Sequence, residues 1–170
     1  MRTKPEKSKD DIELTAAQYA ALIYKIAYSY TKNSAEAEDI LQDVLIAYMT
    51  STTKYTDDEH KKAWLIRVTI NECKKHFRRL KYQLLYDKTT IPIDAPADHS
   101  DVTCAVMELP AKYRIVIHLY YYEQLSVREI GAVLNIKENT VMSLLHRARK
   151  KIKIIMEEAD EHKPISPDIK

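Results

Sequence analysis

The segment 126–153 has residue types and spacing typical of a helix-turn-helix that contacts duplex DNA. Ser126 and Glu129 have the spacing of a capping box, which predicts a short helix after Ser126. Asn135 tolerates the left-handed conformation that ends many helices, and a longer helix is expected from about Glu138. In a helix-turn-helix, the N-terminal side chains of the second helix reach base edges in the major groove.

The polar face of this second helix supplies the candidate contacts with duplex DNA. Polar side chains near the N-terminus suit base edges, and cations further along suit phosphates. The candidates are Lys137, Glu138, Asn139, Thr140, Ser143, His146 and Arg147, followed by the cations Arg149 and Lys150. The same pattern also fits a helical hairpin with a solvated basic face, so spacing alone leaves both interpretations open.

A second basic element lies between His60 and Tyr82, where eight Lys or Arg residues face a single acidic residue, Glu72. Aromatic residues such as Trp64 are interleaved with these cations. Cations hold backbone phosphates and aromatic rings stack unpaired bases, so this composition suits single-stranded nucleic acid. A solvated basic face, with Trp64 and Phe77 in the core, is the alternative.

The segment 34–48 has the opposite sign, because acidic residues surround Gln42. They are Glu36, Glu38, Asp39 and Asp43. Acidic side chains favour a helix N-terminus, and a face of this kind also suits protein docking. Composition does not choose between these two roles.

No group of residues has the spacing of a catalytic or metal site. Cys73 and His76 are three residues apart, but the chain has no CxxC pair, and His99 and Cys104 lie beside an irregular segment. A small core residue is therefore the favoured interpretation of Cys73. The carboxylates of residues 57–59 have no histidine or nucleophile at a defined spacing. We predict a protein that is not an enzyme, with no cofactor, no metal and no small-molecule substrate.

The amino-acid composition excludes several further classes of protein. The 170 residues are 45% hydrophobic and 31% charged and include one glycine, which excludes glycine-rich phosphate loops, dinucleotide-binding turns and nucleophile elbows. The two cysteines, the absence of a signal peptide and the absence of a membrane-length apolar stretch lead us to expect a cytoplasmic protein without membrane insertion.

Helical periodicity runs through most of the chain, and strand signals are nearly absent. A capping-box pattern at Thr15 predicts the start of the first helix, and Ser34 is expected to cap the second. The further helices are expected at about 60–82, 102–109, 113–122, 126–134 and from 138, with a polar loop at 50–59. The sequence predicts an all-α fold of two small domains joined by a flexible linker: a first domain 10–86, a linker 87–101, a helix-turn-helix domain 102–157 and a frayed tail 158–170.

In this order, the motifs resemble the extracytoplasmic-function sigma factors of bacterial RNA polymerase, in the sigma-70 family. Three segments carry the resemblance: 37–45 (AEDILQDVL), 63–71 (AWLIRVTIN), and 109–149, which begins with Leu109-Pro110 and ends with His146-Arg147-Ala148-Arg149. Three motifs in register, with the linker between the second and the third, make the resemblance specific.

The resemblance implies roles for the two domains. The acidic helix is expected to dock on core polymerase through Glu38, Asp39, Gln42, Asp43 and Leu45. The basic helix is expected to melt and read the −10 promoter element through Arg67, Asn71, Lys74, Lys75, Arg78 and Arg79, with Trp64 supporting it and the loop 50–59 holding a flipped base. The helix-turn-helix is expected to read the −35 element, and an anti-sigma factor is the expected inhibitory partner.

The sequence also departs from the family pattern. Met142 and Leu144 stand where basic residues are common, and Asn135 and Asn139 where glycine is common. The common aromatic residue at Leu45 and the acidic one at Lys75 are absent. Two functions compete with the sigma-factor interpretation: a dimeric helix-turn-helix regulator acting without polymerase, and a helical adaptor binding an acidic partner.

Overall fold

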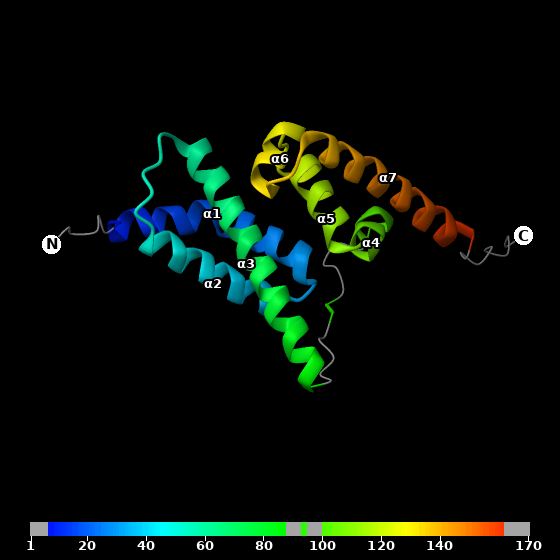
Figure 1. Ribbon diagram of the computed structural model, residues 1–170, viewed down its shortest axis with the longest axis horizontal. Coiled ribbons are helices and arrows are strands. Elements are labelled where there is room, and N and C mark those ends of the chain that lie inside the picture. The colour runs from blue at the N-terminus through cyan, green and yellow to red at the C-terminus, as the bar shows by residue number, and fades with distance from the viewer. Residues whose placement is uncertain (1–6, 88–92, 95–99, 162–170) are drawn as a thin grey trace, which may run out of the picture.

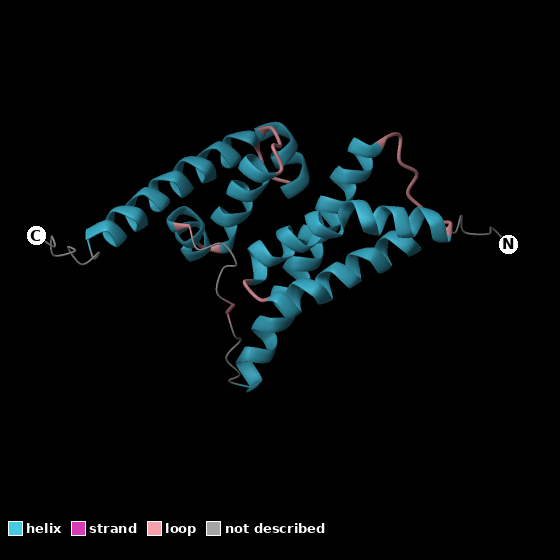
Figure 2. Ribbon diagram, turned by 180° about the vertical axis from the view of Figure 1, so that it is seen from behind, coloured by secondary structure: helices cyan, strands magenta, loops and turns pink. Residues whose placement is uncertain are grey.

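The computed structural model describes residues 7–87, 93–94 and 100–161, and within these every regular element is a helix (Figures 1 and 2). The elements are α1 (Lys9–Thr31), α2 (Ser34–Thr50), α3 (Asp58–Asp87), α4 (Asp101–Glu108), α5 (Ala111–Ile117), a π-helical turn η1 (His118–Tyr122), α6 (Val127–Leu134) and α7 (Glu138–Glu161). The predicted all-α class is confirmed. No helix in the described part of the chain is both long and apolar enough to cross a membrane.

Helices α1, α2 and α3 pack against one another to form an N-terminal lobe (Figure 1). Its core is made of side chains that are almost inaccessible to solvent, among them Ile23, Ile26, Ile40, Leu65 and Ile70. Buried positions recur at helical spacing, such as Ile23 and Ile26 in α1 and Ile66 and Ile70 in α3, so each helix buries one stripe and leaves the opposite face to solvent.

The C-terminal lobe contains α4, α5, η1, α6 and α7, with α7 packed on α4, α5 and α6. Ser126 and Glu129 form the predicted capping box, and Asn135 ends α6 with the predicted left-handed conformation, at φ 56°. The buried stripe of α7 consists of Val141, Leu145 and Ala148. The predicted helix-turn-helix is therefore present.

The two lobes contact each other where α5 meets α1 and where α6 meets α3. Arg114 of α5 is 4% exposed, and its guanidinium donates to the carbonyl oxygens of Ser29 and Tyr30 in α1 and of Leu109 in its own lobe. Beside the second contact, the Lys62 ammonium of α3 lies 3.5 Å from the carboxylate of Glu123, which lies between η1 and α6. Burial lowers the pKa of Arg114 to about 10, so the side chain stays charged at neutral pH.

Several helix ends differ from the sequence expectation. α1 begins at Lys9, because Ser8 rather than Thr15 caps it by accepting from the Asp11 amide. Thr15 is instead buried inside the helix, where its hydroxyl donates to the hydroxyl of Tyr48 at 3.2 Å. Asn33, not Ser34, caps α2.

Helices α3 and α7 are also longer than expected. α3 runs from Asp58 to Asp87, and the Asp57 carboxylate caps its start by accepting from the His60 amide at 2.7 Å. α7 continues to Glu161, four residues into the segment expected to be frayed. Most of the expected linker and the last nine residues of the chain lie outside the described residues.

Candidate nucleic-acid interface

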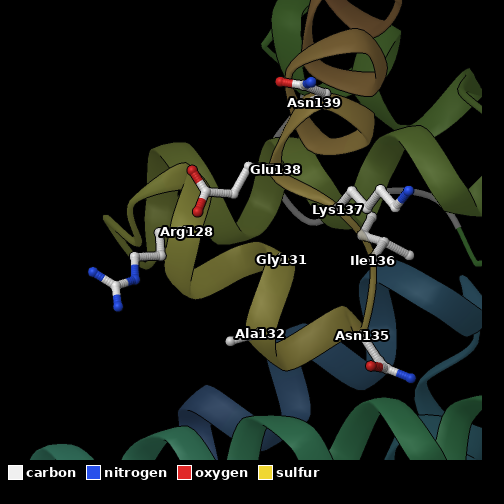
Figure 3. A pocket seen from close by; sticks show the side chains of 8 residues that line it. All are labelled: Arg128, Gly131, Ala132, Asn135, Ile136, Lys137, Glu138 and Asn139. Carbon is white, nitrogen blue, oxygen red and sulfur yellow. The ribbon is translucent and has the colours of Figure 1, made fainter.

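The N-terminal half of α7 presents a polar face beside the turn from α6. A hollow at this turn is lined by residues of both helices: Arg128, Gly131, Ala132, Asn135, Ile136, Lys137, Glu138 and Asn139 (Figure 3). Arg128 and Glu138 extend to one side of the turn and Lys137 to the other (Figure 3). Arg128 was not among the predicted contacts, although its place in the first turn of α6 could have indicated it.

The structure places every predicted duplex-contact residue on the exposed side of the turn and of α7. These residues are Lys137, Glu138, Asn139, Thr140, Ser143, His146, Arg147, Arg149 and Lys150. Two of them are engaged within the lobe. The Ser143 hydroxyl donates to the Asn139 carbonyl at 2.9 Å. Arg149 donates from Nε to the Tyr121 hydroxyl at 2.8 Å, and its guanidinium lies 5.6 Å from the centres of the Tyr120 and Tyr121 rings.

The family departures on α7 have different environments. Met142 is 51% exposed, on the same side as the polar residues. Leu144 is partly buried and packs against the core. Leu144, which stands where a basic residue is common, thus contributes to packing. Met142 instead places an apolar side chain in an otherwise polar face.

The exposed face of α3 forms the second basic surface. Asn71, Lys74 and Arg78 line one hollow, together with Phe77, which is 37% exposed and not part of the core. Lys75 and Arg79 are also exposed, and the Lys75 ammonium lies 3.1 Å from the Glu72 carboxylate.

Arg67 and Trp64 lie apart from this group. Arg67 is exposed but lines a hollow between α3 and α6, with Glu129 on the opposite wall. Trp64 is partly buried and packs edge-on against Tyr48 and Tyr55, with ring centres 6.1 and 5.7 Å apart. Its contacts are those of a core residue, the alternative that its spacing left open.

The predicted docking residues of α2 are on one exposed face, except for Leu45, which is partly buried. The exposed ones are Glu38, Asp39, Gln42 and Asp43. Ile46 and Met49 continue the same face and are 56% and 45% exposed. The prediction missed this apolar end, although positions four and seven residues beyond Gln42 share its face on a helix. We call Asp39, Gln42, Asp43, Ile46 and Met49 the α2 face.

The loop between α2 and α3 borders a hollow of about 470 Å³, which is also lined by Lys7, before α1, and by Asp11, in the first turn of α1. The lining residues are Lys7, Asp11, Tyr48, the loop residues 51–55 and Lys61. Lys7 and Asp11 were not predicted to belong to any site.

The candidate metal ligands do not come together. Among the described residues there is no group of three or more His, Cys, Asp or Glu side chains able to hold a metal ion, and His99 lies outside those residues. Cys73 is inaccessible to solvent, and burial raises the pKa of its thiol to about 12.

Comparisons with known proteins agree with this architecture. The family model of sigma-70 region 2 matches residues 15–82, and that of sigma-70 region 4 matches residues 99–152. The RNA polymerase sigma factor SigV of Bacillus subtilis is 30% identical over 142 residues, which cover 81% of this chain and 86% of the relative. The ECF RNA polymerase sigma factor SigW of the same organism is 28% identical over 155 residues, covering 79% and 83%.

Solved structures share the fold. The sigma factor RpoE from Bartonella quintana, solved with the anti-sigma factor NepR, superposes with a TM-score of 0.73 at 21% identity, over 87% of this chain and 98% of that one. CnrH, solved with the cytosolic domain of CnrY, gives a TM-score of 0.65 at 20% identity, over 89% and 90%. With regions 2 and 4 both matched and a relative 30% identical over most of its length, the chain belongs to the extracytoplasmic-function sigma factors of bacterial RNA polymerase.

Proposed function

We propose that the two lobes divide the work of promoter recognition between them. The N-terminal lobe docks on core RNA polymerase and opens the −10 element, and the C-terminal lobe binds the −35 element as duplex. The observation that carries this division is the presence of two separate exposed basic surfaces, one on α3 in the region 2 lobe and one on α7 in the region 4 lobe. The protein specifies the promoter and is not itself an enzyme.

The α2 face is the proposed polymerase-docking surface. It combines carboxylates at Asp39 and Asp43 with the exposed apolar side chains of Ile46 and Met49. Apolar side chains at the centre of an interface with charges at the rim are typical of protein–protein contacts. We expect Glu38 and Leu45 to lie at the edge of this contact.

The exposed face of α3 is the proposed single-strand surface. Lys74, Lys75, Arg78 and Arg79 supply charge for backbone phosphates, and Asn71 supplies hydrogen-bonding groups. Unstacking a base costs a few kcal/mol, which such contacts must offset. Because Arg67 lines the hollow against α6, a role for it requires the lobes to be apart.

An anti-sigma factor is the proposed inhibitory partner. The sigma factors RpoE and CnrH were each solved with a protein partner, NepR and the cytosolic domain of CnrY respectively. A partner of this chain would act by covering the α2 face, the basic surfaces, or both. Like its polymerase, the protein is expected to act in the bacterial cytoplasm.

Transcription from a randomised-promoter library tests the proposal. Core polymerase is assayed with and without the protein, and we expect enrichment of two short sequence blocks at fixed spacing. Enrichment of a palindrome, in protein-only binding, would support the dimeric regulator instead. Absence of any salt-dependent, sequence-dependent DNA affinity with polymerase present would support the adaptor, because phosphate contacts make DNA binding depend on salt and base contacts make it depend on sequence.

A further inference from the structure

The N-terminal segment that precedes the region 2 match is tied into the N-terminal lobe. The match begins at residue 15, and Lys7 and Asp11 come before it. The Asp11 carboxylate accepts from the Tyr48 hydroxyl at 2.7 Å and lies 3.5 Å from the Lys61 ammonium of α3. These two contacts hold the start of α1 against α2 and α3.

Lys7 reaches across the hollow that the loop 51–57 borders. Its ammonium lies 4.2 Å from the centre of the Tyr48 ring and 4.4 Å from that of Tyr55, and it donates to the Thr53 carbonyl at 3.4 Å. Tyr48 and Tyr55 are themselves stacked, with ring centres 5.9 Å apart. The cation therefore lies over an aromatic pair at the edge of a hollow large enough for a nucleotide.

The contacts of Lys7 leave its charge incompletely satisfied. Within the described part of the chain Lys7 makes no ion pair, whereas its neighbour Lys61 is paired with Asp11. Burial lowers the pKa of Lys7, and the nearby Lys61 lowers it further, against the opposing effect of Asp11. An ammonium group that is partly removed from water, and whose contacts are one long hydrogen bond and two aromatic rings, is strongly stabilised by an anionic oxygen.

We propose that Lys7 binds a phosphate of the unpaired −10 strand at this hollow, so that a segment outside the region 2 match contributes to promoter opening. The inference rests on the proposed function, in which the N-terminal lobe opens the −10 element, and the loop that borders the hollow is the one expected to hold a flipped base of that strand. Lys7 supplies the charge, and Ser51, Thr52 and Thr53, which also line the hollow, supply hydroxyl groups as hydrogen-bonding partners for the nucleotide.

The test compares Lys7→Ala with Lys9→Ala in the holoenzyme. Lys9 is two residues away, its side chain is 87% exposed, and it pairs with Glu13 on the solvent side of α1. The probe is a fluorescent single-stranded oligonucleotide carrying the −10 block selected in the library, titrated at several salt concentrations. Thermal unfolding of each variant controls for folding.

We expect Lys7→Ala to weaken binding of this oligonucleotide about tenfold, as for loss of one charge-assisted hydrogen bond. The magnitude of its salt slope should fall by about 0.7, the value for one phosphate on a single strand. Lys7→Arg should keep both the slope and most of the affinity, and Lys9→Ala should match the unmodified protein.

Two results overturn the inference, and they are distinguishable. If Lys7→Ala and Lys9→Ala bind with the same affinity and salt slope while the unmodified holoenzyme still prefers the −10 block, Lys7 has no part in the site and the proposed function stands. If the unmodified holoenzyme binds the −10 block no better than a scrambled strand, the proposed single-strand site fails and the role of Lys7 fails with it.

Discussion

The guanidinium of Arg114 donates to the carbonyl oxygen of Tyr30 at 2.9 Å, across the boundary between the two lobes. α1 has no lysine or arginine in its own last turn. Its C-terminal carbonyls carry the negative end of the helix dipole, which a cation stabilises. Arg114 thus supplies from the C-terminal lobe the cation that α1 lacks, and this contact couples the packing of one lobe to the other.

Arg114→Met should separate the lobes. The substitution puts a long apolar side chain in place of the arginine and leaves the carbonyls of Ser29 and Tyr30 without their donors. The free energy of unfolding should therefore fall by about 3 kcal/mol. Small-angle X-ray scattering should give a larger radius of gyration than for the unmodified protein. Lys112→Met, at an exposed position of the same helix, is the matched control. An unchanged radius of gyration would show that other contacts hold the lobes together.

Asp43→Arg should abolish binding to core polymerase without unfolding the protein. Asp43 is exposed on the α2 face, so charge reversal changes the proposed interface and leaves the core intact. Ile46→Glu should have a similar effect, because it places a charge in the apolar end of that face. Pull-down with core polymerase, together with circular dichroism, measures both quantities.

The control for these two variants is Glu157→Arg, a charge reversal at another exposed position, near the end of α7. Its polymerase affinity should equal that of the unmodified protein. Unchanged affinity of Asp43→Arg would contradict the assignment of the α2 face, whatever the control shows.

Local sequence patterns correctly predicted the helix ends that depend on a few neighbouring residues. The capping box at Ser126 and the left-handed Asn135 are properties of a few consecutive residues, and both are present. The expected start at Thr15 is wrong because Ser8 caps the helix earlier, while the Thr15 hydroxyl bonds Tyr48, 33 residues away. A capping pattern in sequence cannot show that a longer helix will bury it.

Contacts between distant segments could not be predicted in this way. The bonds of Arg114 to α1 join residues more than 80 positions apart, and no periodicity predicts which helix an arginine will meet. The place of Lys7 over Tyr48 and Tyr55 likewise depends on the tertiary fold. The place of Ile46 on the α2 face could have been predicted, because its spacing from Gln42 puts both residues on one helical face.

Arg147→Ala should weaken binding to a duplex carrying the upstream element about tenfold, a typical cost for one base or phosphate contact. Arg147 is exposed on α7 and makes no hydrogen bond or ion pair with the other described residues, so folding should be unaffected. Opening of a promoter supplied with a pre-melted −10 bubble should stay normal.

Lys153→Ala, further along α7 and paired with Glu157, serves as the comparison. Its loss of duplex affinity should be clearly smaller. If Arg147→Ala impairs the bubble template as much as the duplex, the division of work between the lobes is wrong.

Gly131→Ala should destabilise the C-terminal lobe, although alanine favours helices more than glycine does. A methyl group at position 131 would meet the carbonyl oxygen of Ile136 at 2.9 Å, closer than real side chains allow, and that oxygen belongs to the backbone of the turn. The turn would have to move away from α6, at a cost of about 1–3 kcal/mol, as for other overpacked sites. The melting temperature and the affinity for duplex DNA should therefore fall together. Ala132→Ser, at the exposed neighbouring position, should leave both nearly unchanged. A stabilised Gly131→Ala variant would mean that the turn yields without strain, and the single glycine of the chain would then have no steric role.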